Sequence, residues 1–210
     1  MHWRKKLLKK SLLYLILDKD YLTLKKTRGL LGAPEIGIIQ LRDKTGSKAR
    51  VLKKARWLRK KIDPVKRLLI INDYPDLALK SDADGVHLGQ DDLSVKAARR
   101  LLGPDKIIGL SCHNLAQALK AQKEGADYIG IGPIYPTPTK PAAAAIGIKA
   151  VGKLSRYKIK IPYFAIGDIH PGNLDALIAA GIKRVAVCRA VLAARNPRQI
   201  SKGLYRKLKT

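Results

Sequence analysis

Basic and amide side chains with two-residue spacing follow one apolar run of the sequence. Gln40, Arg42 and Lys44 alternate in the segment that begins at Gln40. In an extended segment, alternate side chains point to the same side. Arginine offers a bidentate fork and lysine a point charge, so this trio could grip a phosphate. A solvated cluster of loop charges would explain an isolated Arg-Lys pair at least as well, so neighbouring segments must decide.

Two aspartates follow two further apolar runs. Asp73 comes after Leu68–Ile71, and Asp92 comes after Gly85–Leu88. Mg²⁺ typically takes one or two carboxylates together with water and substrate phosphates. Taken separately, Asp73 could instead cap the next helix and Asp92 could form a turn. Together with the basic residues Arg42 and Lys44, the two aspartates predict a site for a magnesium-bound diphosphate.

The segment Thr137-Pro138-Thr139-Lys140 offers a second anion-binding surface. Pro136 and Pro138 stiffen what is predicted to be a long loop, and two hydroxyls with an ammonium group can bind an anion. A loop that only connects two elements is usually shorter. The segment is therefore interpreted as functional.

These polar groups recur where short apolar runs end. The near-continuous apolar character of the runs is typical of parallel strands covered on both faces. The eight predicted strands are Leu12–Leu17, Ile36–Leu41, Leu68–Ile71, Gly85–Leu88, Lys106–Leu110, Tyr128–Ile131, Pro162–Ile166 and Arg184–Val187.

Amphipathic segments with helix start and stop signals lie between the runs. They are Ser47–Ile62, with Val51, Leu52, Ala55 and Leu58 on one face; Leu115–Glu124, between Asn114 and Gly125; and Asn173–Ala180, opened by Pro171 or Gly172 and closed by Gly181. Eight strands alternating with helices predict an α/β fold, a single (β/α)8 TIM barrel over residues 1–210. A doubly wound open sheet is the alternative, but it would usually carry a glycine fingerprint where this chain has Asp18-Lys19-Asp20.

The charge balance is strongly basic. Lys and Arg total 43 against 16 acidic residues, a formal net charge of +27. Such an excess favours polyanionic partners, namely phosphorylated substrates, nucleic acid or anionic membrane surfaces. One Phe and two Trp leave little aromatic surface for stacking bases, so nucleic acid is not the expected partner. A general basic bias on solvated helix faces explains the charge equally well.

Cysteine content and hydropathy bear on the compartment. The apolar runs are shorter than the roughly 20 residues that span a bilayer, and the basic start lacks the cleavage site of a signal peptide. Cys112 and Cys188 are too few for a disulfide scaffold. A cytoplasmic protein with no membrane partner is predicted, and the sequence leaves open whether it forms a homo-oligomer.

With these motifs in order, the chain resembles the thiamine-phosphate synthase family. The similarity runs from Tyr14-Leu15 to Asn196-Pro197. Its most specific segments are Gln40 to Lys44, Asn72-Asp73, Ala83 to Asp92, and Gly132-Pro133-Ile134 to Thr137-Pro138-Thr139-Lys140. The resemblance implies a transferase that joins a pyrimidine diphosphate to a thiazole phosphate, with one Mg²⁺ in the active site.

The resemblance also assigns roles to residues. It implies that Arg42, Lys44 and Lys140 are catalytic and that Asp73 and Asp92 bind the metal. The pyrimidine diphosphate would be bound by Gln40, Arg42, Lys44, Asn72, Ser111 and Lys140, and the thiazole phosphate by Thr137, Thr139, Gly167, Cys188 and Arg189.

The family's dissociative mechanism needs charge stabilisation more than it needs a base. Diphosphate leaves first, and the lone pair of the thiazole nitrogen captures the pyrimidine-methyl cation. His87 and His113 are therefore expected to be structural or peripheral. Cys112 and Cys188 are expected to be small, buried barrel residues.

The sequence departs from the family pattern beside the second substrate. The family usually has paired glycines where this chain has Gly167-Asp168, and a serine where it has Arg189. A carboxylate near a phosphate is repulsive unless it is paired or turned away. We therefore expect Arg189 either to offset Asp168 or to contact the phosphate.

Two other functions compete with this interpretation. A related thiazole tautomerase would share the barrel and the phosphate loop, and would rely on a catalytic histidine such as His113. It should not need the complete set of Gln40, Arg42, Lys44 and the two aspartates. A basic barrel that binds RNA or anionic lipid, without activity, is the alternative that the net charge suggests.

Overall fold

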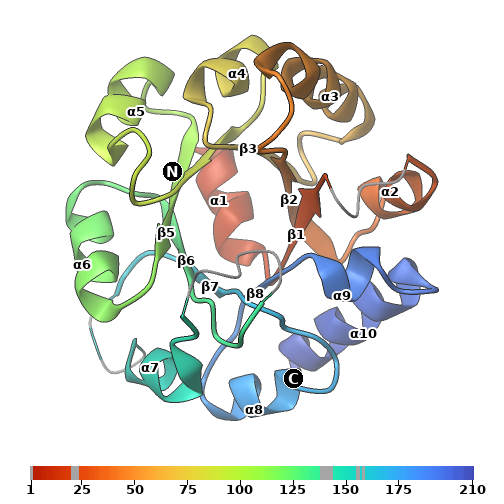
Figure 1. Cartoon of the computed structure of the whole chain (residues 1–210), viewed down its shortest axis with the longest axis vertical. Helices are drawn as coiled ribbons and strands as arrows, with labels where there is room; N and C mark the ends of the chain where they lie inside the picture. The colour runs from red at the N-terminus through yellow and green to blue at the C-terminus, as the bar shows by residue number, and fades with distance from the viewer. Residues whose placement is uncertain (1, 20–23, 138–143, 155–156, 158) are drawn as a thin grey trace.

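The polypeptide forms a closed barrel of eight parallel strands. The computed structural model describes residues 2–19, 24–137, 144–154, 157 and 159–210. The strands pair in chain order, and the last pairs with the first (Figure 1). The predicted strands and barrel are confirmed, with strand ends displaced by no more than two residues. The strands are β1 Leu13–Asp18, β2 Ile36–Arg42, β3 Leu68–Asn72, β4 Gly85–Leu88, β5 Ile107–Cys112, β6 Tyr128–Ile131, β7 Tyr163–Ala165 and β8 Val185–Val187.

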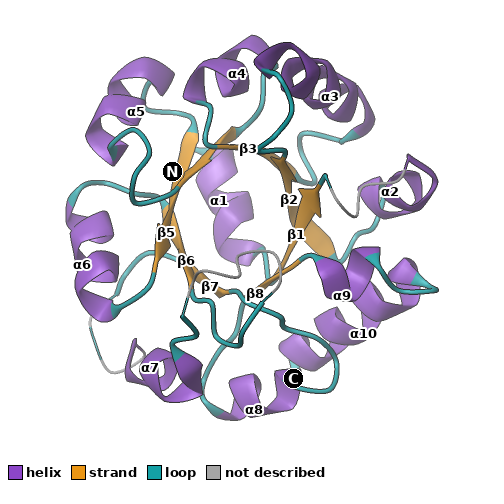
Figure 2. Cartoon of the chain, in the orientation of Figure 1, coloured by secondary structure: helices purple, strands orange, loops and turns teal. Residues whose placement is uncertain are grey.

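Helices surround the strands, and one helix is seen through the middle of the ring (Figure 2). The surrounding helices are α2 Leu24–Leu31, α3 Lys48–Lys61, α4 Pro75–Lys80, α5 Val95–Leu102, α6 Leu115–Lys123, α7 Gly147–Leu154, α8 Leu174–Ala179, α9 Arg189–Leu192 and α10 Pro197–Lys209. The central helix is α1, Trp3–Lys10.

Helix α1 closes the amino-terminal end of the barrel, and the sequence reasoning did not predict it. Arg4 Nε donates to Asp84 Oδ1 over 2.9 Å, and Lys5 Nζ lies 3.0 Å from Asp127 Oδ1. Asp84 directly precedes β4 and Asp127 directly precedes β6, so both ion pairs hold the helix against the starts of the strands. The opposite end of the barrel is left for the polar residues that follow the strands.

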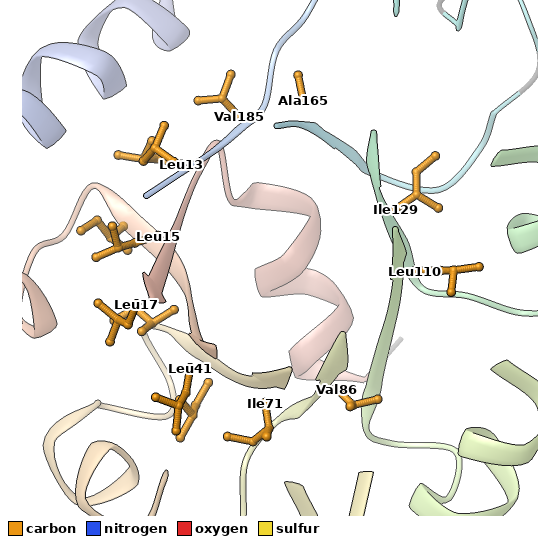
Figure 3. Packing of buried hydrophobic residues seen from close by; sticks show 14 of the residues in the cluster. Leu13, Leu15, Leu17, Leu41, Ile71, Val86, Leu110, Ile129, Ala165 and Val185 are labelled. Atoms are coloured by element: carbon orange, nitrogen blue, oxygen red, sulfur yellow. The ribbon is translucent and has the colours of Figure 1, made fainter. Parts of the chain in front are cut away.

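The strands are apolar on both faces because each face packs in a different layer. Outward side chains such as Leu15 and Ile71 meet the surrounding helices, as the labelled residues in Figure 3 show. Inward side chains such as Ile38, Ile70 and Phe164 fill the barrel. This double burial accounts for the near-continuous apolar runs of the sequence.

The three predicted helices are present with small changes in their bounds. Ser47 caps α3 by accepting from the Arg50 amide at 3.3 Å. Asn114 caps α6 by accepting from the Gln117 amide at 2.9 Å. Helix α8 begins at Leu174, a residue later than predicted, because Asn173 takes the cap position and donates its side-chain amide to the Asp168 carbonyl.

The ladder between β7 and β8 is the shortest in the barrel and is here called the thin seam. Strands β7 and β8 pair at one position, Ala165 with Val185, whereas β1 and β2 pair at six positions. On its other side, β8 pairs with β1 at Leu13, Tyr14 and Leu15. In the part of the chain that the structure describes, no helix has the length and apolarity needed to cross a membrane.

Candidate active site

A pocket opens at the carboxyl ends of the strands, where the sequence places its polar residues. Predicted site residues from six strand ends line it together: Gln40, Arg42, Asn72, Ser111, Thr137, Gly167, Cys188 and Arg189. Thr139 and Lys140 lie outside the described residues, so their roles stay predictions. The structure thus brings these eight predicted substrate-binding residues to one cavity, whereas Lys44 is not part of its lining.

Arg42 is held in this pocket by a partner that the sequence reasoning missed. Its guanidinium donates to the carboxylate of Asp18, whose side chain is fully buried. Asp18 ends β1 and Arg42 ends β2, and the two residues face each other in the ladder. The buried carboxylate orients Arg42 and offsets part of its positive charge, so the phosphate grip is less cationic than the motif alone suggests.

Lys44, Asp73 and Asp92 come together next to Asn72. Lys44 Nζ lies 3.0 Å from Asp73 Oδ2, and the carboxyl of Asp92 is in hydrogen-bonding contact with that of Asp73. Burial raises the pKa of Asp73 above its ordinary value, the Asp92 carboxyl raises it further, and Lys44 opposes both effects. Two carboxylates pressed together in this way would be stabilised by a second cation.

The structure bears on the two alternative roles of the aspartates, a helix cap for Asp73 and a turn for Asp92. Helix α4 begins at Pro75 with Tyr74 as its cap, so Asp73 lies before the cap and turns its carboxylate to Lys44. Asp92 does form a turn contact, because its carboxylate accepts from the Gly89 amide at 2.6 Å. The same carboxylate also contacts that of Asp73.

The donor set fits a magnesium ion. Two oxygen ligands from carboxylates are what Mg²⁺ commonly takes from protein, with water and phosphate oxygens completing the octahedron. Among the described residues, no group of three or more His, Cys, Asp or Glu side chains is placed to hold a metal. Asp73 and Asp92 could supply such carboxylate ligands, and water and substrate phosphate could supply the others.

Gln40 and Ser111 are joined by histidine and tyrosine side chains inside the barrel. Gln40 Nε2 donates to the Tyr14 hydroxyl at 2.6 Å, and Ser111 Oγ lies 2.9 Å from His87 Nε2. His87 was expected to be structural or peripheral; it is buried, lines the pocket and has hydrogen-bond partners at both ring nitrogens, which fits the structural alternative. His113 also lines the pocket, with Nδ1 against the Gly132 carbonyl oxygen. In the sequence, the feature that could have identified these residues is their place at or near strand positions whose side chains point into the barrel.

The far side of the pocket is formed after β7 and β8. Gly167 has φ of 111°, and a Cβ there would lie 2.6 Å from the Ile134 amide nitrogen, so this position requires glycine. Arg189 Nη2 lies 2.6 Å from Asp168 Oδ1. The prediction that Arg189 offsets Asp168 is confirmed, and direct contact of Arg189 with a phosphate stays a prediction.

The two cysteines differ in environment. Cys112 is buried as predicted, and burial raises the pKa of its thiol to about 12. Cys188 was also expected to be buried, but it is only partly buried and lines the pocket. The difference arises because Cys188 follows the end of β8 and caps the short helix α9, where the chain turns over the pocket.

Comparison with known proteins shows the family. The family model for thiamine monophosphate synthase matches residues 13–191. The thiamine-phosphate synthase of Shouchella clausii is 47% identical over 169 residues, which cover 80% of this chain and 81% of that protein. The thiamine-phosphate synthase of Nostoc punctiforme is 42% identical over 207 residues, covering 99% of this chain but 58% of that protein. The chain thus spans somewhat over half the length of the Nostoc relative.

A solved structure agrees with these sequences. Thiamine phosphate pyrophosphorylase from Pyrococcus furiosus superposes with a TM-score of 0.85 at 32% identity, covering 98% of this chain and 97% of the other. The fold, the sequence similarity and the position of the pocket at the carboxyl ends of the strands all agree with membership of this family. The chain belongs to the thiamine monophosphate synthase family and is an enzyme of that transferase class.

Proposed function

We propose that this barrel joins a pyrimidine-methyl diphosphate to a thiazole phosphate, releasing diphosphate with the help of one Mg²⁺. The observation that carries the proposal is the cluster of Lys44, Asp73 and Asp92, in which Asp73 directly follows Asn72, a residue that lines the same pocket as Arg42. Family membership gives the reaction class. The cluster supports the proposal that the leaving diphosphate would be held by basic side chains and a metal ion.

The chemistry is a substitution at the methylene carbon of the pyrimidine. The carbon–oxygen bond breaks and its electron pair leaves with diphosphate, and then the lone pair of the thiazole nitrogen forms the new carbon–nitrogen bond. Arg42 and Lys44 would stabilise the charge that develops on the leaving oxygens. When bound at Asp73 and Asp92, Mg²⁺ would neutralise further charge on the diphosphate.

The remaining residues would orient the two substrates. Gln40, Asn72 and Ser111 line the pocket at the ends of β2, β3 and β5 and could position a planar ring, while Thr137 and Arg189 line it after β6 and β8. Holding the two reacting atoms together replaces a bimolecular encounter by a step within the complex. No strong base is required, because the attacking nitrogen has a free lone pair.

The free cysteines also bear on location. Cys112 and Cys188 are both unbridged, as is usual in a reducing compartment. A cytoplasmic enzyme acting on small phosphorylated substrates remains our proposal.

The function can be tested with purified protein and both substrates. We expect Mg²⁺-dependent formation of thiamine phosphate, and a loss of at least about a hundredfold in kcat/KM in Asp92→Ala, because a missing ligand weakens both metal binding and the leaving group's support. Asp175→Ala is the matched control, since Asp175 pairs with Lys207 on the surface. Full turnover by Asp92→Ala with chelator present would refute the metal role. Isomerisation of the thiazole without coupling would favour the tautomerase.

A further inference from the structure

A continuous run of hydrogen-bonding groups crosses the inside of the barrel along the wall of the pocket, which all of its residues line. The Tyr14 hydroxyl accepts from Gln40 and lies 2.9 Å from the Tyr128 hydroxyl. The Tyr128 hydroxyl lies 3.0 Å from Nδ1 of His87, and Nε2 of His87 lies 2.9 Å from Ser111 Oγ. The five residues, here called the inner chain, come from strands β2, β1, β6, β4 and β5.

The barrel is shaped around the inner chain. Gly109 faces Tyr128, and a Cβ at Gly109 would lie 2.1 Å from Cζ of that ring. Phe164 meets both tyrosine rings edge to face, with centroids 5.3 Å from Tyr14 and 5.8 Å from Tyr128. The rings are therefore fixed, and the distances between the hydroxyls follow from packing.

The two tyrosines stay protonated, because burial raises the pKa of each well above its ordinary value. A protonated hydroxyl has one proton to donate, and a neutral imidazole has one N–H. Each link of the inner chain can therefore hold one proton. The direction set at one end must continue to the other, since a link with two protons or none would leave a buried polar atom unsatisfied.

The amide of Gln40 sets that direction. Because Gln40 donates to Tyr14, the Tyr14 proton would be directed to Tyr128, and the Tyr128 proton to Nδ1 of His87. We propose that the inner chain thereby fixes His87 with its proton on Nε2, donating to Ser111, and leaves the Ser111 hydroxyl to donate into the pocket. Tyr14, Tyr128 and His87 are then positioning residues for Ser111.

This direction has a consequence for ligand choice, which rests on the function proposed above. The pocket presents a hydroxyl donor at Ser111, so the ring bound there must offer an acceptor, such as a ring nitrogen of the pyrimidine. A pyrimidine analogue with carbon in place of that nitrogen would lose the contact. The thiazole phosphate would bind at the residues after β6, β7 and β8, so the inner chain should not affect its binding.

The tautomer of His87 can be measured directly by two-bond ¹H–¹⁵N NMR correlations on the free protein. The chain has four histidines, and the His87→Gln variant identifies the signals of His87. We expect the pattern of an Nε2-protonated ring in the wild-type protein. A ring protonated on Nδ1 would reverse the inner chain and overturn the proposal.

A remote substitution tests whether the direction is transmitted. Tyr14→Phe removes the link between Gln40 and Tyr128 without touching His87, and should leave His87 as a mixture of both tautomers. Tyr163→Phe is the matched control, because Tyr163 packs on the outer side of β7. Circular dichroism would establish that each variant is folded. A pure Nε2 tautomer in folded Tyr14→Phe would overturn the proposal.

Steady-state kinetics give a second readout. In Tyr14→Phe the KM for the pyrimidine diphosphate should rise about threefold to tenfold, the range of one lost hydrogen bond, while the KM for the thiazole phosphate stays unchanged. Equal increases in both values would contradict the proposal. If the tautomers behave as expected but wild-type protein forms no thiamine phosphate, the inner chain stands and the proposed function fails.

Discussion

At the scale of single residues, the site is governed by pairs that face each other across neighbouring strands. Gln40 and Arg42 could be identified from their place at the end of an apolar run, and the roles of Asn72 and Ser111 were implied by the family resemblance. Asp18 could not be identified as the partner of Arg42, because that contact depends on the register of β1 against β2. Sequence spacing gives the side on which a residue lies, but register decides what it faces.

The Arg42–Asp18 pair makes a testable prediction. Asp18→Asn leaves the largely buried Arg42 without its carboxylate, so we expect the free energy of unfolding to fall by about 2 kcal/mol, the order of one charge-assisted hydrogen bond. The freed guanidinium should also bind diphosphate more tightly. Urea unfolding and product inhibition by diphosphate measure the two effects. Unchanged inhibition would mean that Asp18 does not restrain the charge of Arg42.

At the scale of elements, strands were more predictable than the helix that closes the barrel. The strands are buried on both faces and therefore read as apolar runs. In α1, by contrast, only Leu8 is buried, and most of the helix is basic. Besides Leu8, which packs into the inner cluster of the barrel, ion pairs with Asp84 and Asp127 hold α1 in place, and these residues lie far along the chain. Local sequence has no signal for such partners.

The attachment of α1 can be measured through Asp84, which is 1% exposed and pairs with both Arg4 and Arg59. Either arginine alone can compensate the buried carboxylate. We expect Arg4→Ala and Arg59→Ala each to cost about 1 kcal/mol, and the double variant to exceed their sum by about 1 kcal/mol. Urea unfolding of the four proteins gives the coupling. Simple additivity would show that the two arginines act independently.

At the scale of the whole molecule, the net charge of +27 is a property of the surface. Most of the 16 acidic residues already take part in ion pairs, among them the buried Asp18, Asp43 and Asp84. The excess cations therefore repel one another, and this repulsion opposes the compact state. The sequence gives the size of the charge but does not say whether a partner uses it.

Salt should stabilise this protein. Raising NaCl from low ionic strength to about 0.15 M shortens the Debye length to about 8 Å and screens repulsion between surface charges. We expect the thermal midpoint to rise with chloride, whereas a protein with balanced charge would change little. In the control, the exposed lysines Lys53 and Lys60 of α3 are changed to Glu, which lowers the formal net charge from +27 by four, and its midpoint should rise less with salt. A midpoint that falls with salt would show that attractive ion pairs dominate.

The thin seam between β7 and β8 gives the two halves of the pocket wall different stiffness. Asp168 follows β7 and Arg189 follows β8, so their ion pair bridges the seam just above its single ladder position. Slow local opening of the barrel should begin at this junction, because little backbone pairing between β7 and β8 opposes it. The wall that would receive the second substrate is then the compliant one, and the wall around Arg42 and Asn72 is the rigid template.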